Sequence, residues 1–144
     1  MNEINPIELG RQYEFLIQLG GIFHFICGLF HLIFPRMFKW EEHLSGLSKE
    51  DLKVIKGNLY TSNICVMLFW FMLAYIPFFF PHEILTTQIG KALLTAIVVI
   101  WIIRIFILHP VFSNIKEQLS ILRVAFFFIG FLLFFIPWIM CVIL

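Results

Sequence analysis

Four apolar runs, each about 20 residues long, constrain this chain more than any other feature. They cover residues 15–34, 59–80, 89–108 and 122–144. An α-helix of that length, with a rise of about 1.5 Å per residue, crosses the roughly 30 Å hydrocarbon core of a bilayer. Backbone groups in lipid must find their partners within the segment, so the runs should be helices. The pattern predicts an all-α fold: an integral membrane bundle of four transmembrane helices in a single domain, residues 1–144.

The composition agrees with a lipid-facing surface. Of the 144 residues 61% are hydrophobic and 13% are charged, whereas soluble domains carry about 25% charged residues. The net charge of +1 predicts no nucleic-acid partner. Three glutamates and one arginine precede the first run, and no small-x-small cleavage site follows it. We therefore expect the run to be retained rather than removed as a signal peptide.

The distribution of positive charge predicts the orientation of the helices. The first connection (residues 35–58) and the third connection hold seven lysines and arginines: Arg36, Lys39, Lys49, Lys53, Lys56, Lys116 and Arg123. The N-terminal segment and the second connection hold two, Arg11 and Lys91. The positive-inside rule therefore places the first and third connections in the cytoplasm and both termini outside. We expect the membrane to be a bacterial inner (cytoplasmic) membrane.

The first connection has room for structure of its own. Ser48 followed by Asp51 forms a capping pattern, which predicts a short interfacial helix from about Lys49 that can continue into the second run. Lys53 and Lys56 would then meet anionic headgroups, or would serve only to set the topology.

Prolines mark the ends of the other runs. We expect Pro77 and Pro81 to end the second helix and His109-Pro110 to break the third. Pro137 should bend the fourth helix or loosen one hydrogen bond near its outer end. Cys27, Cys65 and Cys141 all lie within apolar runs, and we interpret them as small packing residues.

Two histidines in the first run are the first candidates for a site. His24 and His31 are seven residues apart, so they share a helix face about 10 Å apart along the axis. Gly21 and Gly28 lie near that face and would let another helix approach. Three interpretations remain open: interior histidines bound to a neighbouring helix, a ligand-binding or proton-handling site, and haem or metal ligation. The spacing does not suit one shared ion, so no metal and no cofactor are predicted.

A polar layer is predicted near the cytoplasmic side. His31, Asn63 and Arg104 fall at similar depths on three different runs, and Trp101 lies one turn from Arg104. Tyr60, one turn from Asn63, is either a membrane-belt residue or part of the same layer. We predict that this layer, together with His24, forms the ligand site.

Arg104 itself has three possible roles. No acidic residue falls within an apolar run. Arg104 can snorkel to the cytoplasmic interface, or meet Glu41 or Glu42 of the first connection. It can also bind an anionic ligand, a lipid headgroup or a thiolate.

Two segments, GLFHLIFPRMFKWEE (28–42) and NLYTSNI (58–64), resemble the DoxX-like group of small four-helix membrane proteins. The shared features are a glycine-rich first helix ending in a Pro-Arg step, a Trp just after it, and an Asn/Tyr-containing start to the second helix. The resemblance covers roughly residues 20–65. It implies a four-helix bundle, in a group that includes redox accessories and assembly chaperones.

The chain is also similar to membrane-associated glutathione-metabolising enzymes in length, in its four spans and in its outside termini. That likeness would assign roles to Lys53, Lys56, Asn58, Asn63 and Arg104. Those enzymes have an acidic residue one turn after the asparagine, whereas Val66 and Met67 stand here. The departure puts the enzymatic role in doubt.

The leading functional hypothesis is a non-enzymatic membrane component. It would bind a small hydrophobic or anionic molecule, or a partner protein, near the cytoplasmic leaflet. The alternatives are a small lipid-phase enzyme that uses Arg104 with His31 or His24, and a transporter or channel. The expected partners are the lipid bilayer, such a ligand, and a second copy of the chain or another membrane protein.

Overall fold

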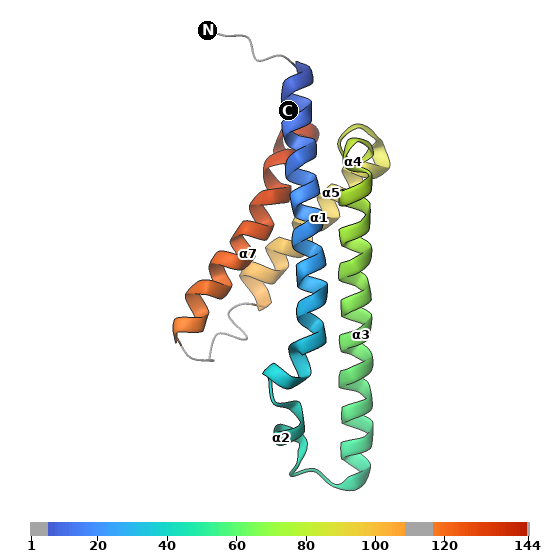
Figure 1. Ribbon diagram of the computed structural model, residues 1–144, viewed down its shortest axis with the longest axis vertical. Helices are drawn as coiled ribbons and strands as arrows, with labels where there is room; N and C mark the ends of the chain where they lie inside the picture. The colour runs from blue at the N-terminus through green and yellow to red at the C-terminus, as the bar shows by residue number, and fades with distance from the viewer. Residues whose placement is uncertain (1–5, 109–116, 144) are drawn as a thin grey trace. The chain divides into compact units, whose positions relative to one another are not determined.

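The computed structural model describes residues 6–108 and 117–143 (Figure 1). This part of the chain is all-helical and contains no strand. Its four long helices are α1 (Pro6–Met37), α3 (Lys49–Phe79), α5 (Gln88–Ile103) and α7 (Glu117–Trp138). Short helices α2 (Trp40–Leu44) and α4 (Pro81–Thr86) lie in the first two connections. Two π-helical turns, η1 (Arg104–Leu108) and η2 (Ile139–Ile143), follow α5 and α7.

Four helical segments of the described chain are each long and apolar enough to cross a membrane, the third and fourth together with π-helical residues that follow α5 and α7. The qualifying segments are Gln12–Met37, Lys49–Phe79, Gln88–Phe106 and Val124–Cys141. The all-α fold class and the four long apolar helices are therefore confirmed.

Helix α3 begins at Lys49, where the capping pattern predicts a start. Ser48 Oγ accepts a hydrogen bond of 3.2 Å from the Asp51 backbone N–H, and its hydroxyl donates to Asp51 Oδ2 at 2.7 Å. The helix then continues past Pro77 to Phe79, so Pro77 does not end it, whereas the end two residues before Pro81 agrees with the prediction. A proline removes only the bond from its own N–H to the carbonyl four residues earlier, and near a helix end that loss can be absorbed.

The other prolines take different places. Pro81 is the first residue of α4, a position that suits a residue with no N–H. Pro137 lies inside α7, one residue before its end. The His109-Pro110 step lies outside the described residues.

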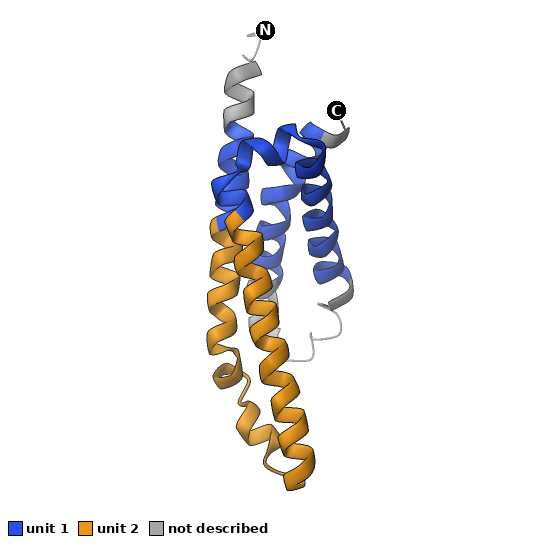
Figure 2. Ribbon diagram, turned by 90° about the vertical axis from the view of Figure 1, so that its right-hand side faces the viewer, with its two compact units in different colours: residues 1–21, 76–144 blue, residues 22–75 orange. Residues whose placement is uncertain are grey.

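The chain divides into two compact units (Figure 2). Unit 2 is residues 22–75, and unit 1 is residues 1–21 together with residues 76–144. The boundaries fall inside the continuous helices α1 and α3 rather than in linkers.

In unit 2, α1 and α3 approach closely at a glycine. A Cβ placed on Gly28 would lie 2.5 Å from Phe71 Cε1, which is closer than real side-chain carbons come. Phe25 packs beside the same ring, with a centroid distance of 5.3 Å. Gly28 therefore permits the contact that brings the His24 and His31 face of α1 against α3.

In unit 1, α5 packs against both α4 and α7. A Cβ on Gly90 would lie 2.5 Å from Ile84 Cα, so only glycine allows α5 to start so close to the α4 backbone. On the α7 side, Trp138 Nε1 donates to Thr95 Oγ1 at 2.9 Å. The fully buried Trp101 lies near Phe127, at 6.3 Å between ring centroids.

Candidate functional site

His31 and Asn63 form a reciprocal pair between α1 and α3. His31 Nδ1 lies 2.9 Å from Asn63 Oδ1, and Asn63 Nδ2 donates to the His31 carbonyl at 2.8 Å. An amide oxygen can only accept, so Nδ1 of His31 carries the proton. The His31 residue is 8% exposed, and both ends of the Asn63 amide bind this one residue. The two residues that the sequence placed in one layer are thus in direct contact.

His24 is bound in a different way, to a backbone carbonyl. Its Nδ1 lies 3.0 Å from Leu73 O, and the side chain is fully buried. Leu73 is four residues before Pro77, and a proline has no N–H with which to continue the helical ladder. The Leu73 carbonyl is therefore the one that α3 leaves without its usual backbone donor, and the protonated Nδ1 of His24 donates to it.

Both histidines therefore have structural partners. Phe34 stacks on the His31 ring at 4.8 Å between centroids, and the Trp70 ring lies 5.0 Å from His24. The geometry agrees with the interpretation of interior histidines bound to a neighbouring helix. Within the described residues, no group of three His, Cys, Asp or Glu side chains could hold a metal ion.

Tyr60 belongs to a third polar contact of unit 2, between α2 and α3. Glu41 of α2 accepts from Lys56 at 2.7 Å and from the Tyr60 hydroxyl at 3.1 Å. Trp40 meets the Tyr60 ring edge-on at 5.5 Å. The hydrogen bond from Lys56, followed by that from Tyr60, lowers the pKa of Glu41 below its ordinary value. Glu41 and Glu42 are both possible partners for Arg104 in the prediction from the sequence. Glu41 here binds Lys56 and Tyr60, and Glu42 binds Lys39 at 3.0 Å.

Arg104 and Trp101 belong to unit 1. Arg104 begins the π-helical turn η1 at the end of α5, and its side chain is half-buried. Its guanidinium carbon lies 4.9 Å from the centre of the Phe127 ring of α7. Trp101 packs near that same ring. The contact of His31 with Asn63 lies within unit 2 and that of Arg104 with Phe127 within unit 1, so the complete three-helix layer stays a prediction.

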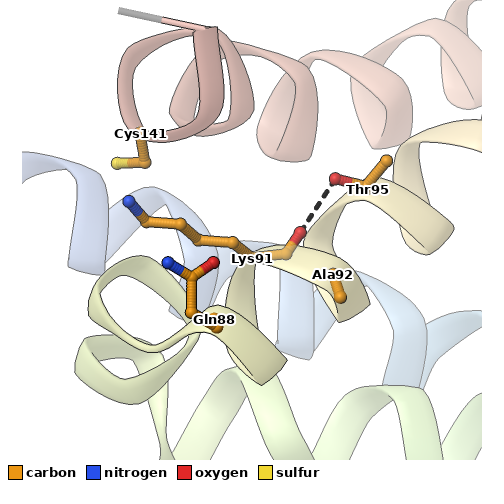
Figure 3. A pocket seen from close by; sticks show the side chains of 5 residues that line it. All are labelled: Gln88, Lys91, Ala92, Thr95 and Cys141. Atoms are coloured by element: carbon orange, nitrogen blue, oxygen red, sulfur yellow. Dashed lines mark hydrogen bonds between the residues drawn. The ribbon is translucent and has the colours of Figure 1, made fainter.

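A pocket at the other end of α5 was not foreseen. It has a volume of about 410 Å³ and is lined by Gln88, Lys91, Ala92, Thr95 and Cys141 (Figure 3). The sequence predicts only a topological role for Lys91 and only a packing role for Cys141. One signal was available: residues 88, 91, 92 and 95 recur at helical spacing, so they share a face of α5. The contribution of Cys141, some 50 residues later, could not be read from the sequence.

Comparison of the chain with protein families, with curated proteins and with solved structures finds no match.

Proposed function

We propose that the chain is an integral membrane protein with four transmembrane helices. In this proposal both termini lie outside a bacterial inner membrane, and the first connection lies in the cytoplasm. The four apolar helices and the excess of lysine and arginine in the first and third connections support this arrangement. Its function is non-enzymatic: it binds an anionic amphiphile near the cytoplasmic leaflet.

The contact of Arg104 with Phe127 is the single observation that carries the proposal. A guanidinium over an aromatic face gains about 0.5–2 kcal/mol, with the larger values in desolvated sites. The ring covers one face of the guanidinium, while its N–H donors lie in the plane of the group. These donors form a rigid fork that matches a carboxylate or phosphate in two places. An arginine held this way near the end of an apolar helix is suited to anion binding.

The histidine geometry gives both rings a structural role, and the binding proposal assigns them no proton-transfer step. A lipid-phase enzyme would need His24 or His31 to move a proton. In each ring Nδ1 already donates to a protein oxygen, at 3.0 Å and 2.9 Å respectively. These bonds fix the orientation of the rings and connect α1 to α3, which is a structural task.

Replacement of Arg104 tests the binding proposal. The protein and its Arg104→Lys and Arg104→Leu variants would be purified in mild detergent, and the lipids that co-purify would be identified by mass spectrometry. We expect several-fold less anionic lipid with Arg104→Leu and an intermediate loss with Arg104→Lys, because lysine keeps the charge but lacks the planar fork. Lys49→Gln, which removes an exposed cation at the start of α3, is the matched control. Equal anionic lipid in all four proteins would reject the proposal.

The orientation is tested by labelling in intact cells. In a background without native cysteines, a cysteine at Lys49 should resist an impermeant thiol reagent, and one at Asn2 should react. The reverse pattern would place the Arg104 end of α5 in the outer leaflet.

A further inference from the structure

The pocket between α5 and η2 is lined by groups suited to an anion. In Figure 3 the Lys91 side chain extends from α5 toward Cys141, and Gln88 lines the same pocket. An ammonium with three donors and an amide with two can together surround the oxygens of one phosphate. Gln88 and Ala92 are exposed, so the pocket opens to the surface.

The wall of the pocket is fixed by two linked hydrogen bonds. The Thr95 hydroxyl donates to the Lys91 carbonyl at 2.8 Å and accepts from Trp138 Nε1 at 2.9 Å. These bonds tie the backbone that carries Lys91 to α7, just before the turn that carries Cys141. The two sides of the pocket are thus held in place without a ligand, which reduces the ordering that binding would require.

The volume of the pocket and its level in the proposed membrane indicate what it can hold. A volume of about 410 Å³ lies within the range of roughly 300–1,000 Å³ that is usual for small-molecule sites. In the orientation proposed above, Lys91 begins the third span at the outer interface, and Trp138 lies in the matching belt of the fourth. Phosphates of lipid headgroups lie at that depth, and the open side of the pocket leaves room for the glycerol and acyl chains.

We propose that this pocket binds the phosphate group of a phospholipid on the non-cytoplasmic side. Lys91 supplies the charge and Gln88 supplies further hydrogen bonds. The proposal rests on the membrane insertion proposed above, but it is independent of the Arg104 site, which lies at the other end of α5.

Cys141 offers a built-in reporter, because a molecule in the pocket would cover its thiol. The whole chain with Cys27→Ala and Cys65→Ala would be purified in a maltoside detergent, which carries no phosphate. The rate of alkylation of Cys141 by N-ethylmaleimide would then be measured by intact-mass spectrometry. The additions are phosphatidylglycerol, diacylglycerol with the same acyl chains, and inorganic phosphate.

We expect phosphatidylglycerol to slow alkylation several-fold and diacylglycerol to leave it unchanged. Lys91→Gln should abolish the slowing and Lys91→Arg should retain it, while a protein whose single thiol is the exposed Cys65 should show none.

Equal slowing by inorganic phosphate would support the phosphate site and identify free anion as its source. Equal rates with and without phosphatidylglycerol, or the same slowing in Lys91→Gln, would overturn the proposal. The Arg104→Leu variant separates the two sites: slowing that persists there while lipid co-purification falls assigns it to Lys91.

Discussion

The two units use polar side chains differently. In unit 2 the candidate residues are held by polar partners: His31 by Asn63, His24 by Leu73 O, and Tyr60 by Glu41, which also binds Lys56. Unit 1 also has polar pairs, Trp138 with Thr95 and His82 with Glu14. Its candidate cations are placed differently: Arg104 lies over the Phe127 ring and Lys91 lines an open pocket.

This difference teaches where a ligand would bind. A polar group that already holds its partner in a fixed geometry loses that bond when it binds a ligand, and leaving a buried partner unsatisfied costs about 1–3 kcal/mol. The pairs of unit 2 therefore act mainly as connections between helices. The ring contact of Arg104 can persist when an anion binds in the plane of its guanidinium, and Lys91 lies beside an open pocket. Loss of the pairs in unit 2 should reduce stability, whereas loss of the cations in unit 1 should reduce binding.

The largest effect on stability is expected at His24. His24→Phe removes the donor to the Leu73 carbonyl, so the free energy of unfolding should fall by about 1–3 kcal/mol. In a Pro77→Ala background the backbone N–H of residue 77 can bond to that carbonyl, and the same replacement should cost about 1 kcal/mol less. Unfolding in mixed detergent micelles measures both values. His43→Phe is the control. The Nδ1 of this exposed histidine lies 3.0 Å from the carbonyl of Lys39, four residues earlier, so its bond is local and does not connect two long helices. An equal cost in both backgrounds would show that Pro77 does not create the need for His24.

A smaller effect is expected for the pair of His31 and Asn63. A double-mutant cycle with His31→Phe and Asn63→Leu should give a coupling between the average of about 0.6 and the maximum of about 1.7 kcal/mol for intramembrane hydrogen bonds. We expect the upper part of that range because the two residues share two bonds. Ser62→Ala, on an exposed neighbour, should show no coupling to His31→Phe. Additive effects of His31→Phe and Asn63→Leu would mean that the pair does not connect the helices.

The smallest effect is expected at Glu41, whose side chain is 65% exposed. Its pKa in the folded protein is lowered, so its stabilising contribution is present above the ordinary value of 4.5 and is lost as the pH falls through the folded value. Wild-type protein should thus lose slightly more stability than Glu41→Gln between about pH 5.5 and pH 3. Parallel pH curves would show that the contact of α2 with α3 does not contribute to stability; Glu42→Gln serves as the control.

The helices and part of the candidate site could be predicted from the sequence. The apolar runs predict the four long helices because each run has about 20 residues, the length that is typical of a membrane-spanning helix. Ser48 and Asp51 predict the start of α3 because the Ser48 side chain accepts a hydrogen bond from the Asp51 backbone N–H, three residues away. The contact of His31 with Asn63 could be anticipated from their equal depth on two neighbouring runs.

Other features depended on information that no local pattern carries. The length of the helix beyond Pro77 depends on whether another group can satisfy the Leu73 carbonyl, and His24 lies 49 residues away. The pocket required the approach of α7 to α5, which sets Cys141 against residues that the sequence separates from it. The division into two units was also not visible, because its boundaries lie inside uniformly apolar helices.

The division has a consequence for the order of synthesis. Unit 2 is one continuous stretch, residues 22–75, so all of its members have been translated once residue 75 leaves the ribosome. Unit 1 needs residues 1–21 and residues 76–144, and its first segment must wait for the second. A nascent chain can therefore close the bonds of His24, His31 and Glu41 as a helical hairpin while α5 and α7 are still to be made. Arg104 and Lys91 belong to the part of unit 1 that is translated after that hairpin.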